Sequence, residues 1–125
     1  MREILIRSGS VAIRARLLDT PTASQVWSAL PIYSVAQTSG SEVYFETRVR
    51  AVREPSARDI VDAGEIAFWT ERDAIAIGFG PTLISQTDEI RLAAPCNVWA
   101  QALDDVRALH VVQAGERIAV MEADS

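Results

Sequence analysis

The sequence GEIAFW (residues 64–69), followed after four polar residues by AIAIGFGPT (residues 74–82), decides the fold. Both segments are short, apolar and rich in β-branched or aromatic side chains, which is typical of buried strands. The intervening TERD has the length and polarity of a hairpin turn, and a Gly-Pro pair ends the second segment. We therefore predict a hairpin of two antiparallel strands, 65–69 and 74–79.

Strands with one apolar face flank this hairpin along the chain. Residues 4–7 and 11–18 are apolar-rich runs on either side of a Ser-Gly-Ser turn, which predicts a second hairpin. Residues 41–49 alternate apolar and polar side chains with a period of two. This period places one side of a strand against a core and the other side toward water.

One segment between these strands has the period of a helix. Ala23, Val26, Trp27 and Leu30 recur at the spacing of one helical face. Thr20 is a suitable N-cap residue, and a proline follows it in the first turn, where a missing N–H costs little. We predict an amphipathic helix that ends before the proline at position 31, because proline disfavours helical geometry at the preceding residue.

The rest of the chain adds further short elements. We predict strands near 89–92, 97–102 and 117–122, a helical turn at 104–109, and a polar connector over 51–63 with a short turn of helix. Many short strands and one helix favour a small closed or nearly closed β-barrel, because closure removes exposed sheet edges. The expected fold class is mainly β, in a single domain spanning residues 1–125.

Composition excludes several classes of function. The net charge is −5, and the twelve basic residues, all arginine, are scattered along the chain, which disfavours binding to nucleic acid or to an anionic membrane. A chain without lysine forms no Schiff base and has no P-loop lysine. Cys96 and His110 are each alone, so we expect no disulfide, no metal site and no cofactor. No apolar run approaches the ~20 residues that span a bilayer, and we expect a cytoplasmic protein.

Three motifs in order resemble a known family. They are LPI (residues 30–32) followed by GSEVYF (40–45), then GEIAFW (64–69), and then FGPT (79–82), with Asn97-Val98 matching a later Asn-Val. The chain resembles the prokaryotic cyclophilin-like small barrels, whose members mostly lack an assigned activity. The resemblance covers most of the chain and implies a cyclophilin-like barrel with a binding groove outside it.

The chain departs from this family at three positions. Ser39 stands where the family often has tryptophan, Gly78 where it has the first of two phenylalanines, and Leu83 where it has proline. The motifs that identify true cyclophilin isomerases are missing; the nearest match, Phe45-Glu46-Thr47-Arg48, has one residue too many. Along a strand that spacing puts Phe45 and Arg48 on opposite faces.

The candidate binding residues come from the polar face of residues 41–49 and from the ends of the predicted hairpin strands. Polar and aromatic side chains that project outward from the barrel suit a groove, although an ordinary solvated sheet face with a Glu–Arg pair is the alternative. Aromatic residues at strand ends form an apolar pocket or, alternatively, pack into the core. The candidate ligand-binding residues are Glu42, Tyr44, Arg48, Trp69, Phe79, Pro81 and Thr82.

These residues support three hypotheses for function. The first is a binding module that holds a small molecule or a short peptide in a groove on the outside of the barrel. The second is an enzyme, either a weak, non-standard peptidyl-prolyl isomerase or a hydrolase accessory domain; no catalytic residue is assigned. The third is an associative protein that forms a homo-oligomer.

Overall fold

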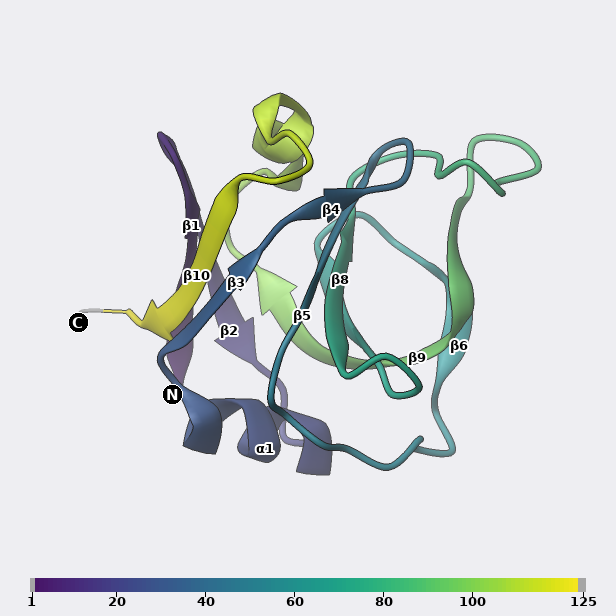
Figure 1. Ribbon diagram of the computed structural model, residues 1–125. Helices are drawn as coiled ribbons and strands as arrows, with labels where there is room; N and C mark the ends of the chain where they lie inside the picture. Colours follow the sequence, from purple (N-terminus) through teal and green to yellow (C-terminus); the bar gives the residue numbers. More distant parts are fainter. Residues whose placement is uncertain (1, 124–125) are drawn as a thin grey trace.

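The computed structural model describes residues 2–123, which form an antiparallel barrel of short strands with one α-helix (Figure 1). Strand bounds follow the alternation of apolar and polar residues wherever one side of a strand is buried. The strands are β1 Glu3–Ser8, β2 Val11–Leu17, β3 Ile32–Val35, β4 Gln37–Thr38, β5 Glu42–Glu46, β6 Arg58–Val61, β7 Glu65–Trp69, β8 Ala74–Gly78, β9 Ile90–Ala102 and β10 Arg117–Glu122. The helices are α1 Pro21–Ala29 and the 3-10 helix η1 Val106–Val111.

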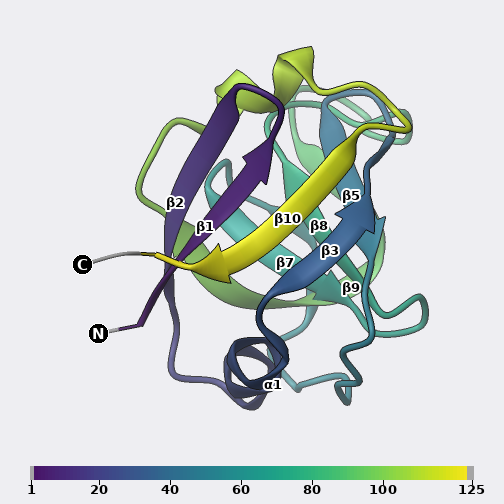
Figure 2. The same cartoon turned by 60° about the vertical axis from the view of Figure 1, so that its left-hand side comes forward.

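The strands of the barrel follow the order β3-β10-β1-β2-β9-β7-β8-β5-β4, and β6 pairs with β9 outside this path. Figures 1 and 2 show the sheet curving so that its two ends approach each other. Both predicted hairpins are present: β1 pairs with β2, and β7 pairs with β8. The prediction of a mainly β, nearly closed barrel is confirmed.

The barrel closes between β3, at one end of the sheet, and β5, which is followed only by the two-residue β4 at the other end. Here the strands are joined through a side chain, because Ser34 Oγ donates a hydrogen bond of 2.6 Å to the carbonyl oxygen of Glu46. β4 continues from β3 and pairs with β5, with Gln37 opposite Tyr44. We call this boundary the seam; it leaves space beside the end of β5.

The helix α1 lies across one end of the barrel (Figures 1 and 2). Thr20 caps its N-terminus by accepting a hydrogen bond of 3.1 Å from Ala23 N, and Pro21 occupies the first turn. Ala23 and Val26 are buried against the core. The predicted helix is therefore confirmed. No helix within residues 2–123 has the length and apolar run needed to cross a membrane.

The core occupies the inside of the barrel. Trp99, Phe45 and Phe68 are its largest fully buried side chains, and isoleucines and valines of most strands fill the space between them. Each large apolar side chain buried in this way contributes about 2 kcal/mol to the free energy of unfolding. We call this set the inner core.

Several elements differ from the sequence predictions. The connector over 51–63 contains the strand β6, which pairs with β9. The two strands predicted near 89–92 and 97–102 are one continuous strand of 13 residues. β3 and β4 were not predicted, and the predicted helical turn is the 3-10 helix η1.

Candidate functional site

The strand β5 presents two different faces, as its sequence predicts. Val43 and Phe45 are fully buried in the inner core. Glu42 and Tyr44 point to the outside of the barrel because side chains alternate along a strand. The register of the sheet then determines what lies beside them on this outer face.

Small residues line the outer face next to β5. Glu42 lies opposite Gly78 of β8, and Tyr44 lies opposite Ala76, which in turn lies opposite Ala67 of β7. Residues of this size leave room for other parts of the chain to lie on the sheet. The outer face is therefore covered in part by a second layer.

That layer is the first half of β9 together with β6. Its side chains form a small apolar group with the outer face, which we call the outer cluster. A methyl group added at Gly78 would lie 2.3 Å from Ile90 Cγ2, so only glycine allows Ile90 to lie this close to β8. The outer cluster consists of Val61, Ala67, Ala76, Ile90, Leu92 and Cys96, with Tyr44, Trp69 and Val98 packed against it.

Two aromatic rings meet at the edge of the outer cluster. The rings of Tyr44 and Trp69 lie edge to face, with centroids 6.3 Å apart and planes at 66°. The guanidinium of Arg72 lies 5.4 Å from the centroid of the Trp69 ring. Both rings are half-buried, so part of each remains open to a molecule outside the barrel.

Glu42 is the most unusual group on this face. Its side chain is 6% exposed, and burial raises the pKa of its carboxyl to about 7. Among residues 2–123 no donor or cation partners this carboxyl, and burial is the sole cause of the shift. The carboxyl oxygens of Glu42 still touch solvent. Within residues 2–123, the one side-chain polar atom that is both fully enclosed and without a hydrogen-bond partner is Trp99 Nε1, not an oxygen of Glu42. A buried, unpartnered carboxyl is costly and calls for an external partner.

Cys96 shares this part of the molecule but is chemically inert. Burial, and next the charge of Glu42, raise the pKa of its thiol to about 12. The thiol donates a hydrogen bond of 3.2 Å to the carbonyl oxygen of Ala94. A thiol that stays protonated is a poor nucleophile and a poor metal ligand. Cys96 is thus a free, buried cysteine.

The loop after β8 is tied to the start of β5 and to β9. Ser41 N donates to the carbonyl oxygen of Pro81 at 2.9 Å. The buried Thr82 hydroxyl donates to the carbonyl oxygen of Arg91 at 2.5 Å, and Thr82 N donates to Ser85 Oγ at 2.8 Å. Thr82 thus holds this loop beside Glu42, while Pro81 is exposed on its surface.

Two of the candidate residues lie away from this face. Phe79 packs against the inner core. Arg48 is exposed beyond the end of β5, where it lines a recess of about 510 Å³ at the seam, which we call the seam recess. The remaining walls of the seam recess are Ala29, Pro31, Ile32, Tyr33, Glu46 and Thr47. The structure therefore places Glu42 and Tyr44 next to each other on the outer face and Trp69 against Tyr44, in the row of Glu46, with Thr82 near Glu42.

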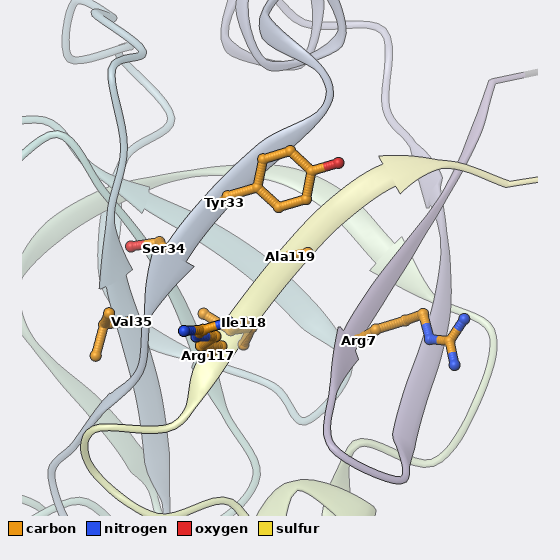
Figure 3. Close-up of a pocket in the computed structure, with 7 residues that line it drawn as sticks. All are labelled: Arg7, Tyr33, Ser34, Val35, Arg117, Ile118 and Ala119. Atoms are coloured by element: carbon orange, nitrogen blue, oxygen red, sulfur yellow. The ribbon is translucent and has the colours of Figure 1, made fainter.

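A further recess lies over β3 and β10, and sequence reasoning missed it. It has a volume of about 540 Å³, and the Tyr33 ring, 75% exposed, reaches from β3 over β10 (Figure 3). The alternation that follows the Leu-Pro pair could have identified this strand, since residues 33 and 35 are exposed and residue 32 is buried. The recess is lined by Arg7, Tyr33, Ser34, Val35, Arg117, Ile118 and Ala119.

No group of three or more His, Cys, Asp or Glu side chains in the described part of the chain could hold a metal ion. His110 is exposed, and its Nδ1 lies 2.8 Å from the carbonyl oxygen of Arg107. The carboxylates Glu65 and Glu89 are each paired with an arginine, Arg58 and Arg91 respectively. Glu42 is thus set apart from the paired carboxylates around it.

Comparison with known proteins gives a family and two solved structures. The family model described as cyclophilin-like matches residues 2–121. The solution structure of the hypothetical protein AF2241 from Archaeoglobus fulgidus is similar to this chain with 34% identity and a TM-score of 0.84, covering 98% of this chain and 95% of that one. The structure of McbB in complex with tryptophan is 16% identical with a TM-score of 0.73, covering 98% of this chain and 45% of McbB. Comparison with curated proteins finds no match.

Proposed function

The chain belongs to the cyclophilin-like family, and we propose that it is a binding domain that holds a small organic molecule on the outer face of its barrel. The site consists of Glu42, Tyr44 and Trp69. The first supplies a polar anchor, and the two aromatic residues supply apolar contact area. This proposal keeps the outer face that the sequence suggested and narrows the set of contact residues.

The observation that carries the proposal is the state of Glu42. The carboxyl of a residue that is only 6% exposed, without a partner within residues 2–123, destabilises the folded protein whenever it is ionised. A chain gains nothing in stability from such a group, whereas a ligand that hydrogen-bonds to it removes the penalty. Perturbed carboxyls of this kind concentrate at functional sites.

Two further features support a small-molecule ligand. Half-buried aromatic rings beside a polar anchor are the usual composition of small-molecule sites. A protein of the same fold, McbB, has been solved in complex with tryptophan, so this architecture is compatible with holding a small aromatic molecule. In the present chain the aromatic contact area comes from Tyr44 and Trp69, whose rings lie edge to face.

The test is a thermal-shift screen of the full chain against a library of small metabolites. A ligand at a hundredfold excess over its Kd should stabilise the protein by about 2.7 kcal/mol. This gain should vanish in Tyr44→Ala and persist in Tyr33→Ala, a matched control that removes the tyrosine of the recess over β3 and β10. Loss of the gain in Tyr33→Ala alone would move the site to that recess and refute the proposal.

A second candidate function, peptidyl-prolyl isomerisation, is favoured by one observation. Arg48 lines the seam recess next to the apolar side chains of Pro31 and Ile32. An arginine donor beside an apolar proline pocket is what stabilisation of a twisted prolyl amide requires. If this activity exists, Arg48→Ala should abolish the catalysed isomerisation of a proline peptide, while Glu42→Gln should leave it unchanged.

A further inference from the structure

We propose that the ligand beside Glu42 is an organic cation, an ammonium group carried on a flat aromatic body, with Glu42 as its counter-charge. This inference rests on the proposed function and names the chemical class of the ligand. It follows from the charges around the site, from the hydrogen-bonding capacity of a carboxylate, and from the aromatic pair.

The charges of the surroundings favour a cation. The arginines of β6 and β9, the strands of the second layer, are already paired: Arg58 with Glu65, and Arg91 with both Glu89 and Asp59. Arg53 pairs with Glu71 and Arg72 with Glu46 in the same way. Within residues 2–123 no free guanidinium therefore faces Glu42, and an anionic ligand would meet a carboxyl without a cation to hold it. A cationic ligand would meet a buried carboxyl that lacks a partner within residues 2–123.

Hydrogen bonding points in the same direction. An ionised carboxylate accepts hydrogen bonds and donates none, and an ammonium group donates three and accepts none. Bonds in which both groups are charged are about twice as strong as neutral ones. The pairing is strengthened further because Glu42 is 6% exposed and little water screens it.

The aromatic pair defines the rest of the ligand. Ala67 and Ala76 are buried beneath the second layer, so the exposed parts of the Tyr44 and Trp69 rings are the apolar surface left for a bound molecule. A flat ring can stack on such a surface, and aromatic faces also attract cations. Arg72 already lies over Trp69, which shows that this ring accepts a cation on its face.

The titration of the site follows from the groups around Glu42. On β5 the next outward residue is Tyr44; β8 contributes Gly78 and Ala76, the loop after β8 contributes Thr82, and β9 contributes Cys96, whose pKa is raised to about 12. Gly78, Ala76 and Thr82 have no ionisable side chain, and the thiol of Cys96 stays protonated between pH 5 and 8. Binding of a cation should therefore strengthen as pH rises through 7, as Glu42 ionises.

The test compares two indole probes that differ in charge, tryptamine (ammonium) and indole-3-propionate (carboxylate), by isothermal titration calorimetry at pH 8. Tryptamine should bind at least ~30-fold more tightly than indole-3-propionate, and Glu42→Gln should remove that preference. Glu122→Gln is the matched control, since it changes an exposed glutamate on β10, a strand that contributes nothing to the outer cluster, and should leave the affinity unchanged.

A second measurement reports on Glu42 directly. At pH 7 about half of the Glu42 carboxyls are protonated, so binding of an ammonium group should release ~0.5 proton. The binding enthalpy should then differ between phosphate and Tris buffers in proportion to their ionisation enthalpies. A binding enthalpy that is the same in both buffers would rule out Glu42 as the counter-charge.

The possible failures are distinguishable. If indole-3-propionate binds as tightly as tryptamine, and Tyr44→Ala weakens both, the site exists but the cationic ligand class is wrong. If neither probe binds and no library compound depends on Tyr44, the proposed function fails along with this inference. Retained preference for tryptamine in a folded Glu42→Gln variant would also overturn the assignment of Glu42.

Discussion

Two regions of this barrel each contain a buried polar side chain, and the two side chains differ in whether the protein supplies hydrogen-bond partners for them. Between β9, α1 and the segment after β5, Asn97 is fully buried and its amide is saturated. Its Nδ2 donates to Thr22 Oγ1 and to the carbonyl oxygen of Val52, each at 2.9 Å, and its Oδ1 accepts from Glu54 N at 2.9 Å. On the outer face, Glu42 is 6% exposed and has no partner within residues 2–123.

The difference separates a structural polar group from a binding group. Asn97 joins a strand, a helix and a loop because each of its hydrogen bonds replaces one that water would make. Glu42 has no such hydrogen bonds within the protein, so its burial lowers the free energy of unfolding, and a ligand that binds the carboxyl can remove this penalty. The two regions should therefore respond in opposite directions when the polar group is removed.

The largest effect is expected at Asn97. Asn97→Ala removes three hydrogen bonds and leaves Val52 O and Glu54 N without partners, so the free energy of unfolding should fall by about 4 kcal/mol. Urea unfolding at pH 7 measures this change. A loss below about 1 kcal/mol would show that water replaces the amide and that Asn97 is not structural.

The next largest effect concerns Glu42 and has the opposite sign. Folding raises the pKa of this carboxyl from 4.5 to about 7, so the folded state binds more protons than the unfolded state between these pH values. The contribution of Glu42 to stability therefore falls as pH rises through this window and is lost above it. Glutamine does not titrate.

The measurement is the difference in unfolding free energy between Glu42→Gln and the unmodified protein at several pH values. The difference should increase by about 3 kcal/mol in favour of Glu42→Gln between pH 4 and pH 8, given the pKa of about 7. A difference that does not depend on pH would mean that Glu42 is solvated in the folded state.

A smaller effect is expected where the second layer meets the sheet. Gly78→Ala should destabilise the protein by about 2 kcal/mol, because the new methyl group would lie 2.3 Å from Ile90 Cγ2. The double variant Gly78→Ala/Ile90→Ala removes the clashing methyl group and should cost less than the sum of the single variants. Strict additivity in thermal unfolding would contradict the close contact.

The smallest effect is expected at the loop beside Glu42. Thr82→Val removes the hydroxyl that donates to Arg91 O and should lower stability by about 1 kcal/mol. Amide exchange should speed up at Ile84, whose N–H donates to Thr82 Oγ1 at 3.4 Å. Thr38→Val, at an exposed threonine, is the control. Unchanged exchange at Ile84 would show that the loop is held by its backbone alone.

Much of the barrel could be predicted because one-sided burial leaves a clear pattern. β2 alternates strictly between buried and exposed residues, and the helix has both a cap and a stop. β6 was missed because its exposed residues, Arg58 and Ile60, obscure the alternation. β9 was divided in two because Pro95 interrupts the pattern, although the strand continues through it and changes partner from β6 to β7.

The candidate site was predicted in part for the same reason. Alternation alone places Glu42 and Tyr44 on the outer face. It also places Phe79 inside, since Ile75 and Ile77 share its parity along β8 and both are buried. The burial of Glu42 could not be predicted, because the segments that cover this face come from β9 and from the loop after β8, which are distant in sequence.

The contact between Gly78 and Ile90 has a consequence for how relatives of this chain differ. The family pattern places phenylalanine where Gly78 stands here, and a ring at that position would occupy the space that Ile90 fills. Residues 78 and 90 should therefore covary: a large side chain at one position should accompany a small one at the other. Each such exchange would change which side chains border the carboxyl at position 42, so homologous barrels should differ in ligand preference while keeping the same strands.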